Sequence, residues 1–329
     1  MKALKILILI LSTICLSFAY PSWIKPGLVV VYSYEGGAGT NIGTVRGSGV
    51  YGVGYKIFLV LQVDNTGIYG TTYTMLGSQF SGIFYNVEVI PLGDITTGGL
   101  FYLDPKQADR ETLQKQAPPN CQVSGNPGTY ILECNIRGNI KKTVINYDRK
   151  TGLITELTTM DVSFDTQGRS STVAKQRYIR HFYISVPKVN TFPPVATISK
   201  TYRMLTNAGI GYIPSGIVNI QYITTTGNVN KYKIYISEAP IAIDVIGIPL
   251  IGPHYIHPVL LNIKTLLHIP EANFQIVLGQ GNRGGISLQH IWNGTLVLQQ
   301  EFDPRNGLKY YDYYPQYMGG LSAIFELVQ

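Results

Sequence analysis

Alternation of apolar and polar side chains dominates the pattern along this chain. A period of two is typical of strands with one buried face. Turns containing glycine, proline or asparagine separate these segments. We predict strands at 50–63, 69–76, 83–90, 217–224, 231–237, 241–246, 287–292, 295–302 and 308–314. The pattern therefore indicates a mainly β fold.

Four blocks of sequence occur twice, in the same order and at nearly constant separation. The clearest pair is Tyr102-Leu103-Asp104-Pro105 and Tyr255-Ile256-His257-Pro258. The other pairs are 87–90 with 243–246, Asn120 with Asn273, and 147–153 with 302–308. Repetition of this kind is the signature of an internal duplication.

Each copy is expected to hold several strands, one short helix and a closing β-meander. The first helix is predicted over 105–117, capped by Asp104 and ended by Pro118-Pro119, and the second over 258–268. The fold class is therefore mainly β, with one short helix per repeat. We expect two tandem duplicated domains, half-barrel or sandwich-like, at 20–186 and 195–329, joined by a linker at 187–194.

The second predicted helix is apolar on most sides, so other parts of the molecule must cover it. Two interpretations are open. The helix packs between the two units, or it lines a hydrophobic pocket in which Leu261 and Leu266 contact a ligand.

The N-terminus has the form of a secretory signal peptide. Lys2 and Lys5 precede an uncharged stretch, and Ser17-Phe18-Ala19 fits the cleavage rule, so residues 1–19 are predicted to be removed. The stretch is too short to span a bilayer of about 30 Å as a helix. An uncleaved anchor and lipidation at Cys15 are the alternatives. No later stretch is long enough for a transmembrane anchor, so we expect a secreted or cell-surface protein.

Charge argues against nucleic acid as a partner. Charged residues make up 14% of the chain, and loss of residues 1–19 lowers the net charge from +7 to +5. The basic residues are scattered, whereas nucleic-acid binding requires a concentrated basic face.

Two cysteines remain after the signal peptide. Folding the chain about Pro127-Gly128 places Cys121 opposite Cys134 on one face of a hairpin. An even pair in an exported protein predicts a disulfide. Asn293-Gly294-Thr295 is a glycosylation sequon and also a tight turn, so Asn293 is a candidate for glycosylation only.

Motifs of the common enzyme classes are absent from the sequence. Two Gly-x-Gly-x-x-Gly runs, at 47–52 and 279–284, precede strand-like sequence instead of a helix, so we interpret them as glycines at strand edges. His254 and His257 are weak candidates for metal ligation, since His257 aligns with the capping residue Asp104. We expect no cofactor and no metal.

Five tyrosines cluster near the C-terminus, among them Tyr311 and Tyr313 on one face of a predicted strand. They cover a sheet, or they bind a ligand such as a sugar. We take Tyr311 and Tyr313 as candidate ligand-binding residues.

The stretch Lys142-Thr143-Val144-Ile145-Asn146-Tyr147-Asp148-Arg149-Lys150-Thr151-Gly152-Leu153, continued through 154–157 and 165–171, resembles the late hairpins of periplasmic lipoprotein carriers. The resemblance implies curled half-barrels closed by helices, with a cavity for acyl chains. It covers the hairpins alone and assigns no cavity residue.

These observations predict a secreted or cell-surface protein that acts by binding or assembly, with catalysis uncertain and disfavoured. Its partner would be a glycan, an apolar small molecule or another surface protein. The alternatives are a carrier of an apolar ligand in a curled sheet and an extracellular hydrolase without a recognisable motif.

Overall fold

A computed structural model describes most of the chain after residue 19. The described residues are 20–42, 45–46, 50–64, 67–77, 79–82, 88–90, 101–106, 108–136, 138–165, 168–207, 209, 211–237, 239–281, 283–317 and 321–328. The predicted signal peptide lies outside them. Only the last three residues of the strand predicted at 83–90 lie inside.

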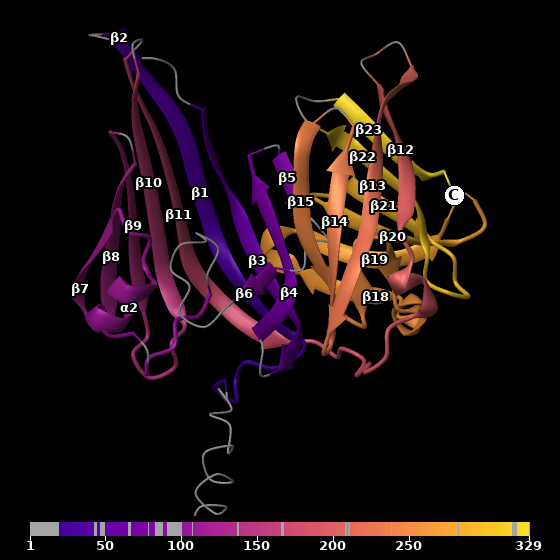
Figure 1. Cartoon of the computed structure of the whole chain (residues 1–329), viewed down its shortest axis with the longest axis horizontal. Helices are drawn as coiled ribbons and strands as arrows, with labels where there is room; N and C mark the ends of the chain where they lie inside the picture. Colours follow the sequence, from indigo (N-terminus) through magenta and orange to yellow (C-terminus); the bar gives the residue numbers. More distant parts are fainter. Residues whose placement is uncertain are drawn as a thin grey trace, which may run out of the picture.

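The first half of the chain forms one antiparallel sheet of eleven strands, in indigo to magenta in Figure 1. The strands are β1 (Leu28–Ile42), β2 (Val45–Arg46), β3 (Val50–Asp64), β4 (Gly67–Leu76), β5 (Gln79–Gly82), β6 (Glu88–Ile90), β7 (Cys121–Asn126), β8 (Thr129–Ile136), β9 (Asn139–Tyr147), β10 (Ile154–Asp165) and β11 (Gly168–Tyr183). Their main order is β5-β4-β3-β1-β11-β10-β9-β8-β7.

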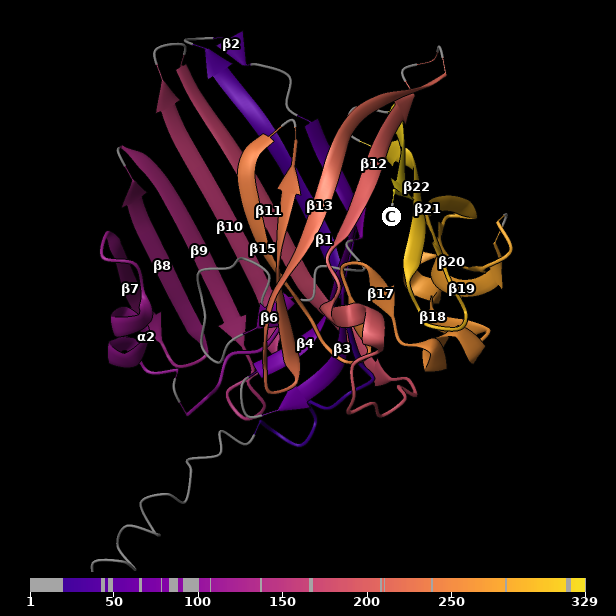
Figure 2. The same ribbon diagram turned by 45° about the vertical axis from the view of Figure 1, so that its right-hand side comes forward.

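The second half forms an antiparallel sheet of ten strands beside the first (Figures 1 and 2). The strands are β12 (Lys200–Asn207), β13 (Tyr212–Thr226), β14 (Val229–Ile236), β15 (Ala239–Gly247), β18 (Thr265–Ile269), β19 (Phe274–Gln280), β20 (Ile286–Trp292), β21 (Thr295–Phe302), β22 (Lys309–Tyr317) and β23 (Leu321–Leu327). Their order is β15-β14-β13-β12-β23-β22-β21-β20-β19-β18. The crossover holds the short pair β16 (Ile251–Gly252) and β17 (Tyr255–Ile256).

Both sheets follow the same path. The early strands run outward from the first one, a crossover segment follows, and the later strands return until the last pairs with the first. These pairs are β1 with β11 and β12 with β23. The mainly β prediction is therefore confirmed.

The two halves also repeat a turn contact at the residue level. Leu103 donates its N–H to the carbonyl of Gly152 at 2.9 Å, and Ile256 donates to the carbonyl of Gly307 at 3.0 Å. Both glycines have φ of +75°, and a Cβ on either would overlap the carbonyl oxygen of the residue that donates to it. Glycine is therefore required at both turns.

A buried tyrosine spans each sheet in the same way. The hydroxyl of Tyr32 on β1 donates to the carbonyl of Ile154 at 2.8 Å. The hydroxyl of Tyr202 on β12 donates to the carbonyl of Lys309 at 2.7 Å. In both halves the bond ties the first strand to the residue after the repeated turn.

The first helix is shorter than predicted. Helix α2 spans Arg110–Gln116, and Asp109 caps it by accepting from the N–H of Thr112 at 2.9 Å. The prediction of Asp104 as its cap is wrong, because Asp104 accepts from Lys106 in a separate turn. Among the described residues, no helix is long and apolar enough to cross a membrane.

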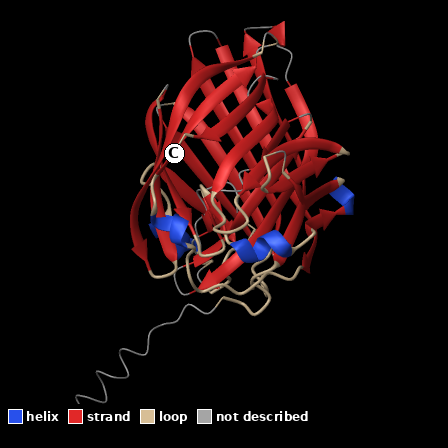
Figure 3. Ribbon diagram, turned by 90° about the vertical axis from the view of Figure 1, so that its right-hand side faces the viewer, coloured by secondary structure: helices blue, strands red, loops and turns tan. Residues whose placement is uncertain are grey.

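The second predicted helix does not form. Its sequence divides into the 3-10 helix η2 (Pro258–Asn262) and the strand β18, which pairs with β19. Two other 3-10 turns, η1 (Pro194–Thr197) and η3 (Pro270–Ala272), are the remaining helical segments of the described residues, and Figure 3 shows the helices, in blue, in the lower half of the view. An apolar segment without strong helical signals adopts the structure that its neighbours favour.

The described residues form three hydrophobic cores. One belongs to the first half and includes Leu113 of α2, and another belongs to the second half around Tyr202 and Tyr232. The third is shared by the two halves. Its residues from the first sheet are Val29, Val31, Ile57, Leu59, Tyr69, Tyr73 and Met75. We call the face of the second sheet that carries Tyr202, Tyr232 and Leu288 its inner face, and the opposite one its outer face.

The predicted disulfide is confirmed. Cys121 and Cys134 are bonded and lie directly opposite each other on β7 and β8. The predicted register holds along the hairpin, where Val123 pairs with Leu132.

Candidate functional site

Tyrosine, arginine and glutamate side chains gather on the outer face of the second sheet. Successive side chains of a strand point to opposite faces. Asp312 of β22 lies in the inner-face row of Leu288, so its neighbours Tyr311 and Tyr313 lie on the outer face. Glu301 of β21 and Glu326 of β23 flank Tyr311 on the adjacent strands. Tyr311 is therefore placed between two carboxylates, whereas Tyr313 lies between Gln299 and Ile324.

Glu301 is fully buried although it lies on the outer face. Gln299 donates to one of its carboxylate oxygens at 2.9 Å, and the hydroxyl of Tyr310 donates to the other at 3.2 Å. A buried carboxylate requires such donors, because burial without them is costly. The neighbouring hydroxyl of Ser287, opposite Glu301 on β20, is buried without a hydrogen-bond partner among the described residues.

A glycine-rich loop covers this carboxylate. The N–H of Gly281 donates to the carbonyl of Gly285 at 2.8 Å, which closes the loop between β19 and β20. A Cβ on Gly281 would lie 2.9 Å from the carboxyl carbon of Glu301, and a Cβ on Gly285 would overlap the hydroxyl of Tyr310. Gly281 of the run at 279–284 is thus needed for close approach, as is the following Gly285, and the expectation of strand-edge glycines missed this role.

The loop carries Arg283 onto the sheet. Its guanidinium lies 4.5 Å from the centroid of the Tyr311 ring. It also donates to Glu326 at 2.6 Å, while Arg203 of β12 donates to the second oxygen of Glu326 at 2.8 Å. The bonds from Arg203 and Arg283 lower the pKa of Glu326, and burial raises the pKa of Tyr311 to about 12. At neutral pH the tyrosine is therefore protonated and the glutamate charged.

Two further tyrosines continue the cluster toward β13. The hydroxyl of Tyr212 lies 2.9 Å from that of Ser322, so its ring reaches across β12 to β23. Burial and a hydrogen bond with Tyr212 raise the pKa of Tyr313. Tyr212 is 40% exposed. We call Tyr212, Tyr313 and Tyr311 the tyrosine stripe.

The cluster is suited to binding a polar ligand that has apolar faces. Both arginines bond to Glu326, and Glu301 is buried beneath the loop. The tyrosines present partly open rings beside hydrogen-bonding groups, a combination that is typical of small-ligand sites. Glu301, Glu326, Arg203 and Arg283 were not predicted from the sequence, which pointed to this place only through Tyr311 and Tyr313.

The other predicted ligand residues lie elsewhere. Leu261 is 5% exposed in the shared core, and Leu266 is half-buried against the same core. Both residues are distant in sequence from the tyrosines of the stripe, and both belong to the core that includes side chains of the first sheet. The structure does not bring them together with Tyr311 and Tyr313.

The two histidines considered for metal binding have separate roles. His257 accepts from the N–H of Val259 and so caps η2. His254 is fully buried, and its Nε2 lies 2.8 Å from the carbonyl oxygen of Val195. Among the described residues, no three His, Cys, Asp or Glu side chains are placed to hold a metal ion.

The glycosylation candidate lies at a hairpin tip. Asn293 is exposed between β20 and β21 and has φ of +49°. A tight turn with Asn-Gly accounts for this conformation. The side chain is accessible, and its glycosylation stays a prediction.

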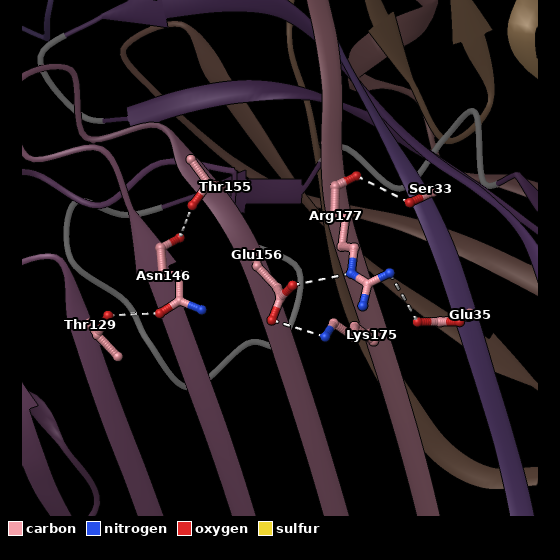
Figure 4. A network of polar contacts seen from close by, with 8 residues as sticks. All are labelled: Ser33, Glu35, Thr129, Asn146, Thr155, Glu156, Lys175 and Arg177. Carbon is pink, nitrogen blue, oxygen red and sulfur yellow. Dashed lines mark hydrogen bonds and ion pairs between the residues drawn. The ribbon is translucent and has the colours of Figure 1, made fainter.

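A second polar network crosses the first sheet, on the side of β1 that carries Val29 and Val31 (Figure 4). Arg177 donates to Glu156 at 3.1 Å and lies 4.0 Å from Glu35, and Lys175 lies 3.0 Å from Glu156. Thr129 donates to the side-chain oxygen of Asn146 at 2.8 Å. These groups bond to each other across adjacent strands. We favour the outer face of the second sheet as the site, because a charged side chain there lies over an aromatic ring.

Comparison with known proteins assigns no family. No protein-family model matches the chain, and no curated protein matches it in sequence. A structure of a protein of unknown function from the DUF3598 family, from Nostoc punctiforme PCC 73102, is 8% identical and has a TM-score of 0.23 over 91% of this chain and 95% of that one. A double mutant of transferrin binding protein B from Haemophilus parasuis Hp5 is 7% identical and has a TM-score of 0.16 over 92% of this chain and 78% of that one. Scores this low establish no shared family, so the function is argued from the site.

Proposed function

We propose that this chain is a secreted or cell-surface protein that binds a glycan through the outer face of its second sheet. The observation that carries the proposal is the Arg283 guanidinium stacked on Tyr311 between Glu301 and Glu326. The disulfide supports export, because such bonds persist in oxidising compartments.

The chemistry of the cluster favours a sugar. The rings of the tyrosine stripe offer apolar faces for the C–H faces of a pyranose, and the phenol hydroxyls, guanidinium groups and carboxylates offer hydrogen bonds to sugar hydroxyls. The side chains are held by one another, which limits the entropy lost on binding.

The hydrolase alternative has weaker support. Two carboxylates flank Tyr311, as glycoside hydrolysis would require. However, hydrogen bonds from two arginines lower the pKa of Glu326. A general acid needs a raised pKa, so Glu326 is a poor proton donor.

The carrier alternative also has weaker support. The sheets would have to hold an apolar ligand against their apolar side chains. Among the described residues, these side chains are buried in the three cores, in which Leu261 of η2 also packs. Binding on the outer face requires no displacement of these residues.

Retention on immobilised polysaccharides tests the proposal. The purified chain is expected to bind at least one member of a broad glycan panel, and Arg283→Ala together with Tyr311→Ala is expected to abolish that binding. Arg177→Ala is the matched control, because Arg177 is an exposed, glutamate-paired arginine on the other sheet. Equal loss in the control, or no dependence on Arg283, would contradict the proposal.

We also propose that the two halves arose by duplication. The common strand order, the two glycine turns and the two tyrosine-to-carbonyl bonds support this origin. The site then arose in the second half alone, since Glu301, Arg283 and Tyr311 all follow residue 199.

A further inference from the structure

We infer that the ligand is an acidic glycan, and that a carboxylate or sulfate group of this glycan binds between Arg203 and Arg283. This inference rests on the proposed glycan-binding function and names the chemical class of the glycan. It follows from which charged groups of the site are exposed and from the hydrogen-bond donors that these groups leave open.

A single carboxylate holds the two arginines side by side. Arg203 of β12 donates from Nη2 to one oxygen of Glu326 at 2.8 Å, and Arg283 donates from Nη2 to the other oxygen at 2.6 Å. The guanidinium of Arg283 also lies 4.5 Å from the centroid of the Tyr311 ring. The two positive groups are therefore neighbours on the outer face, although they come from distant parts of the sequence.

Most donors of the two guanidinium groups remain open to a ligand. Each guanidinium carries five N–H donors in a plane, and the bond to Glu326 uses one of them. The side chains of Arg203 and Arg283 are 54% and 48% exposed. The planar fork of an arginine matches an oxyanion, which accepts two parallel bonds from it. The pair can thus bind an anionic group while it keeps both bonds to Glu326.

The carboxylates of the site present little negative charge to such a ligand. Glu326 is 17% exposed, and both of its oxygens already accept from the arginines. Glu301 is fully buried, and its oxygens accept from Gln299 and Tyr310. The charged groups that a ligand meets are mainly the two guanidinium groups, and a surface of one sign favours partners of the opposite sign.

The rings beside the arginines favour a sugar over a free inorganic anion. Tyr311 and Tyr313 are half-buried on the same face, and Tyr212 is 40% exposed. An acidic sugar can place its charged group between the arginines and its C–H face against a ring. An inorganic anion would use the arginines alone.

Retention on two matched pairs of immobilised polysaccharides tests the charge of the ligand. Each pair shares a backbone and differs in charge: polygalacturonate with its methyl ester, and dextran sulfate with dextran. The purified chain is expected to bind at least one acidic member roughly tenfold more tightly than its neutral partner. The pair that shows this difference identifies the bound group as a carboxylate or a sulfate.

Replacement of Arg203 tests the place of binding. Arg203→Ala is expected to weaken binding of the acidic polysaccharide roughly tenfold. Arg203→Lys should weaken it nearly as much, because an ammonium group keeps the charge but lacks the planar pair of donors. Lys231→Ala is the matched control. Lys231 is exposed and precedes the inner-face Tyr232 on β14, so it lies on the outer face. Its loss removes the same charge and is expected to leave binding unchanged.

The other outcomes separate the inference from the proposed function. Equal retention on the acidic and neutral members of both pairs would overturn the acidic ligand. Equal weakening by Arg203→Ala and Lys231→Ala, or full binding by Arg203→Lys, would overturn it as well, because either result would show a general attraction of a basic chain to acidic polymers. In each case, retention of a glycan that depends on Arg283 and Tyr311 would leave the proposed function standing.

Discussion

At the scale of the residue, the contribution of a buried hydroxyl group to stability depends on whether it has a hydrogen-bond partner. Ser287 and Tyr202 are both buried and each carries one hydroxyl. The hydroxyl of Tyr202 donates to the carbonyl of Lys309, whereas that of Ser287 has no partner among the described residues. A hydrogen-bonded group stabilises the fold, and an unpartnered one lowers its stability.

Replacement of these two hydroxyls is therefore expected to have opposite effects. Tyr202→Phe should lower the free energy of unfolding by about 1 kcal/mol, and Ser287→Ala should leave it unchanged or raise it by up to about 1 kcal/mol. Urea unfolding of both variants measures the difference. A loss of stability in Ser287→Ala as large as that in Tyr202→Phe would contradict the assignment.

Buried imidazoles predict a loss of stability in acid. Burial lowers the pKa of His254 from 6.5 to about 4 and that of His290 to about 3. The unfolded chain then binds protons at a higher pH than the folded chain does. Stability is fully present above about pH 6.5 and falls as the pH drops toward the folded values, by roughly 3 kcal/mol for His254.

Urea unfolding between pH 7 and pH 4 checks this dependence. The wild-type chain should lose stability over this range, and His254→Gln should show a shallower loss. An identical slope in both proteins would show that His254 is not the group that titrates.

At the scale of the element, turns differ in why they require glycine. Gly307 and Gly227 both have positive φ, at +75° and +58°. A Cβ on Gly307 would overlap the carbonyl oxygen of Ile256, whereas a Cβ on Gly227 would meet nothing within 4 Å. Comparing the two positions therefore separates two losses of stability. One comes from the positive φ angle, and the other comes from the overlap of a Cβ with the carbonyl oxygen.

Gly227→Ala is accordingly expected to lower stability by about 1 kcal/mol, the cost of the left-handed angle alone. Gly307→Ala should lower it by more than about 3 kcal/mol, because the repeated turn must also move away from β17. Thermal unfolding compares the two variants. Similar melting temperatures would contradict the close approach of Gly307 to the carbonyl oxygen of Ile256.

The disulfide also stabilises the molecule at the scale of the element. It joins β7 to β8 at the edge of the first sheet, with both cysteines buried in the first core. Replacement of Cys121 and Cys134 by serine should lower the free energy of unfolding by about 3 kcal/mol. Denaturant titration measures this loss in the double variant and in the reduced wild-type chain, each compared with the disulfide-bonded wild-type chain. Stability equal to that of the disulfide-bonded chain in both would contradict the prediction.

Helices were predicted less well than strands, for reasons that lie in their surroundings. Strands such as β20 and β21 follow from alternation and an Asn-Gly turn, which are local signals. The apolar residues of 258–268 favour burial without specifying a conformation. Pairing of β18 with β19 and packing against the first sheet determine it.

At the scale of the whole molecule, the shared core holds the two halves together. Each half also has a core made of its own residues only. The shared core joins Val29, Val31 and Tyr73 of the first sheet to Leu260 and Phe274 of the second half. Each half therefore depends on the other to cover an apolar surface.

Separate expression of the halves tests this dependence. Residues 20–186 and residues 195–329, expressed separately, should each expose apolar surface, bind a hydrophobic dye and aggregate, whereas the whole chain should not. Cooperative unfolding of both halves alone, with no dye binding, would show that the shared core is dispensable.

The candidate site also belongs to the scale of the whole molecule. Its residues come from β12, β13, β21, β22, β23 and the loop between β19 and β20. Tyr311 and Tyr313 were predicted because they alternate on a single strand. Arg203 and Tyr212 are separated from them by about a hundred residues of sequence and meet them only because the last strand of the sheet pairs with its first strand.

The sequence by itself determined the mainly β fold, the hairpin register of Cys121 with Cys134, and the position of Tyr311 and Tyr313, two of the three tyrosines of the stripe, on one face of a strand. These features depend on alternation and turn chemistry, which act over a few residues. Only the tertiary structure decided that 258–268 forms no α-helix, that Leu261 is buried between the halves, and that Glu301, Glu326 and Arg283 surround Tyr311. The physical reason is that burial and strand pairing between distant segments depend on the free energy of the whole fold, which no local pattern contains.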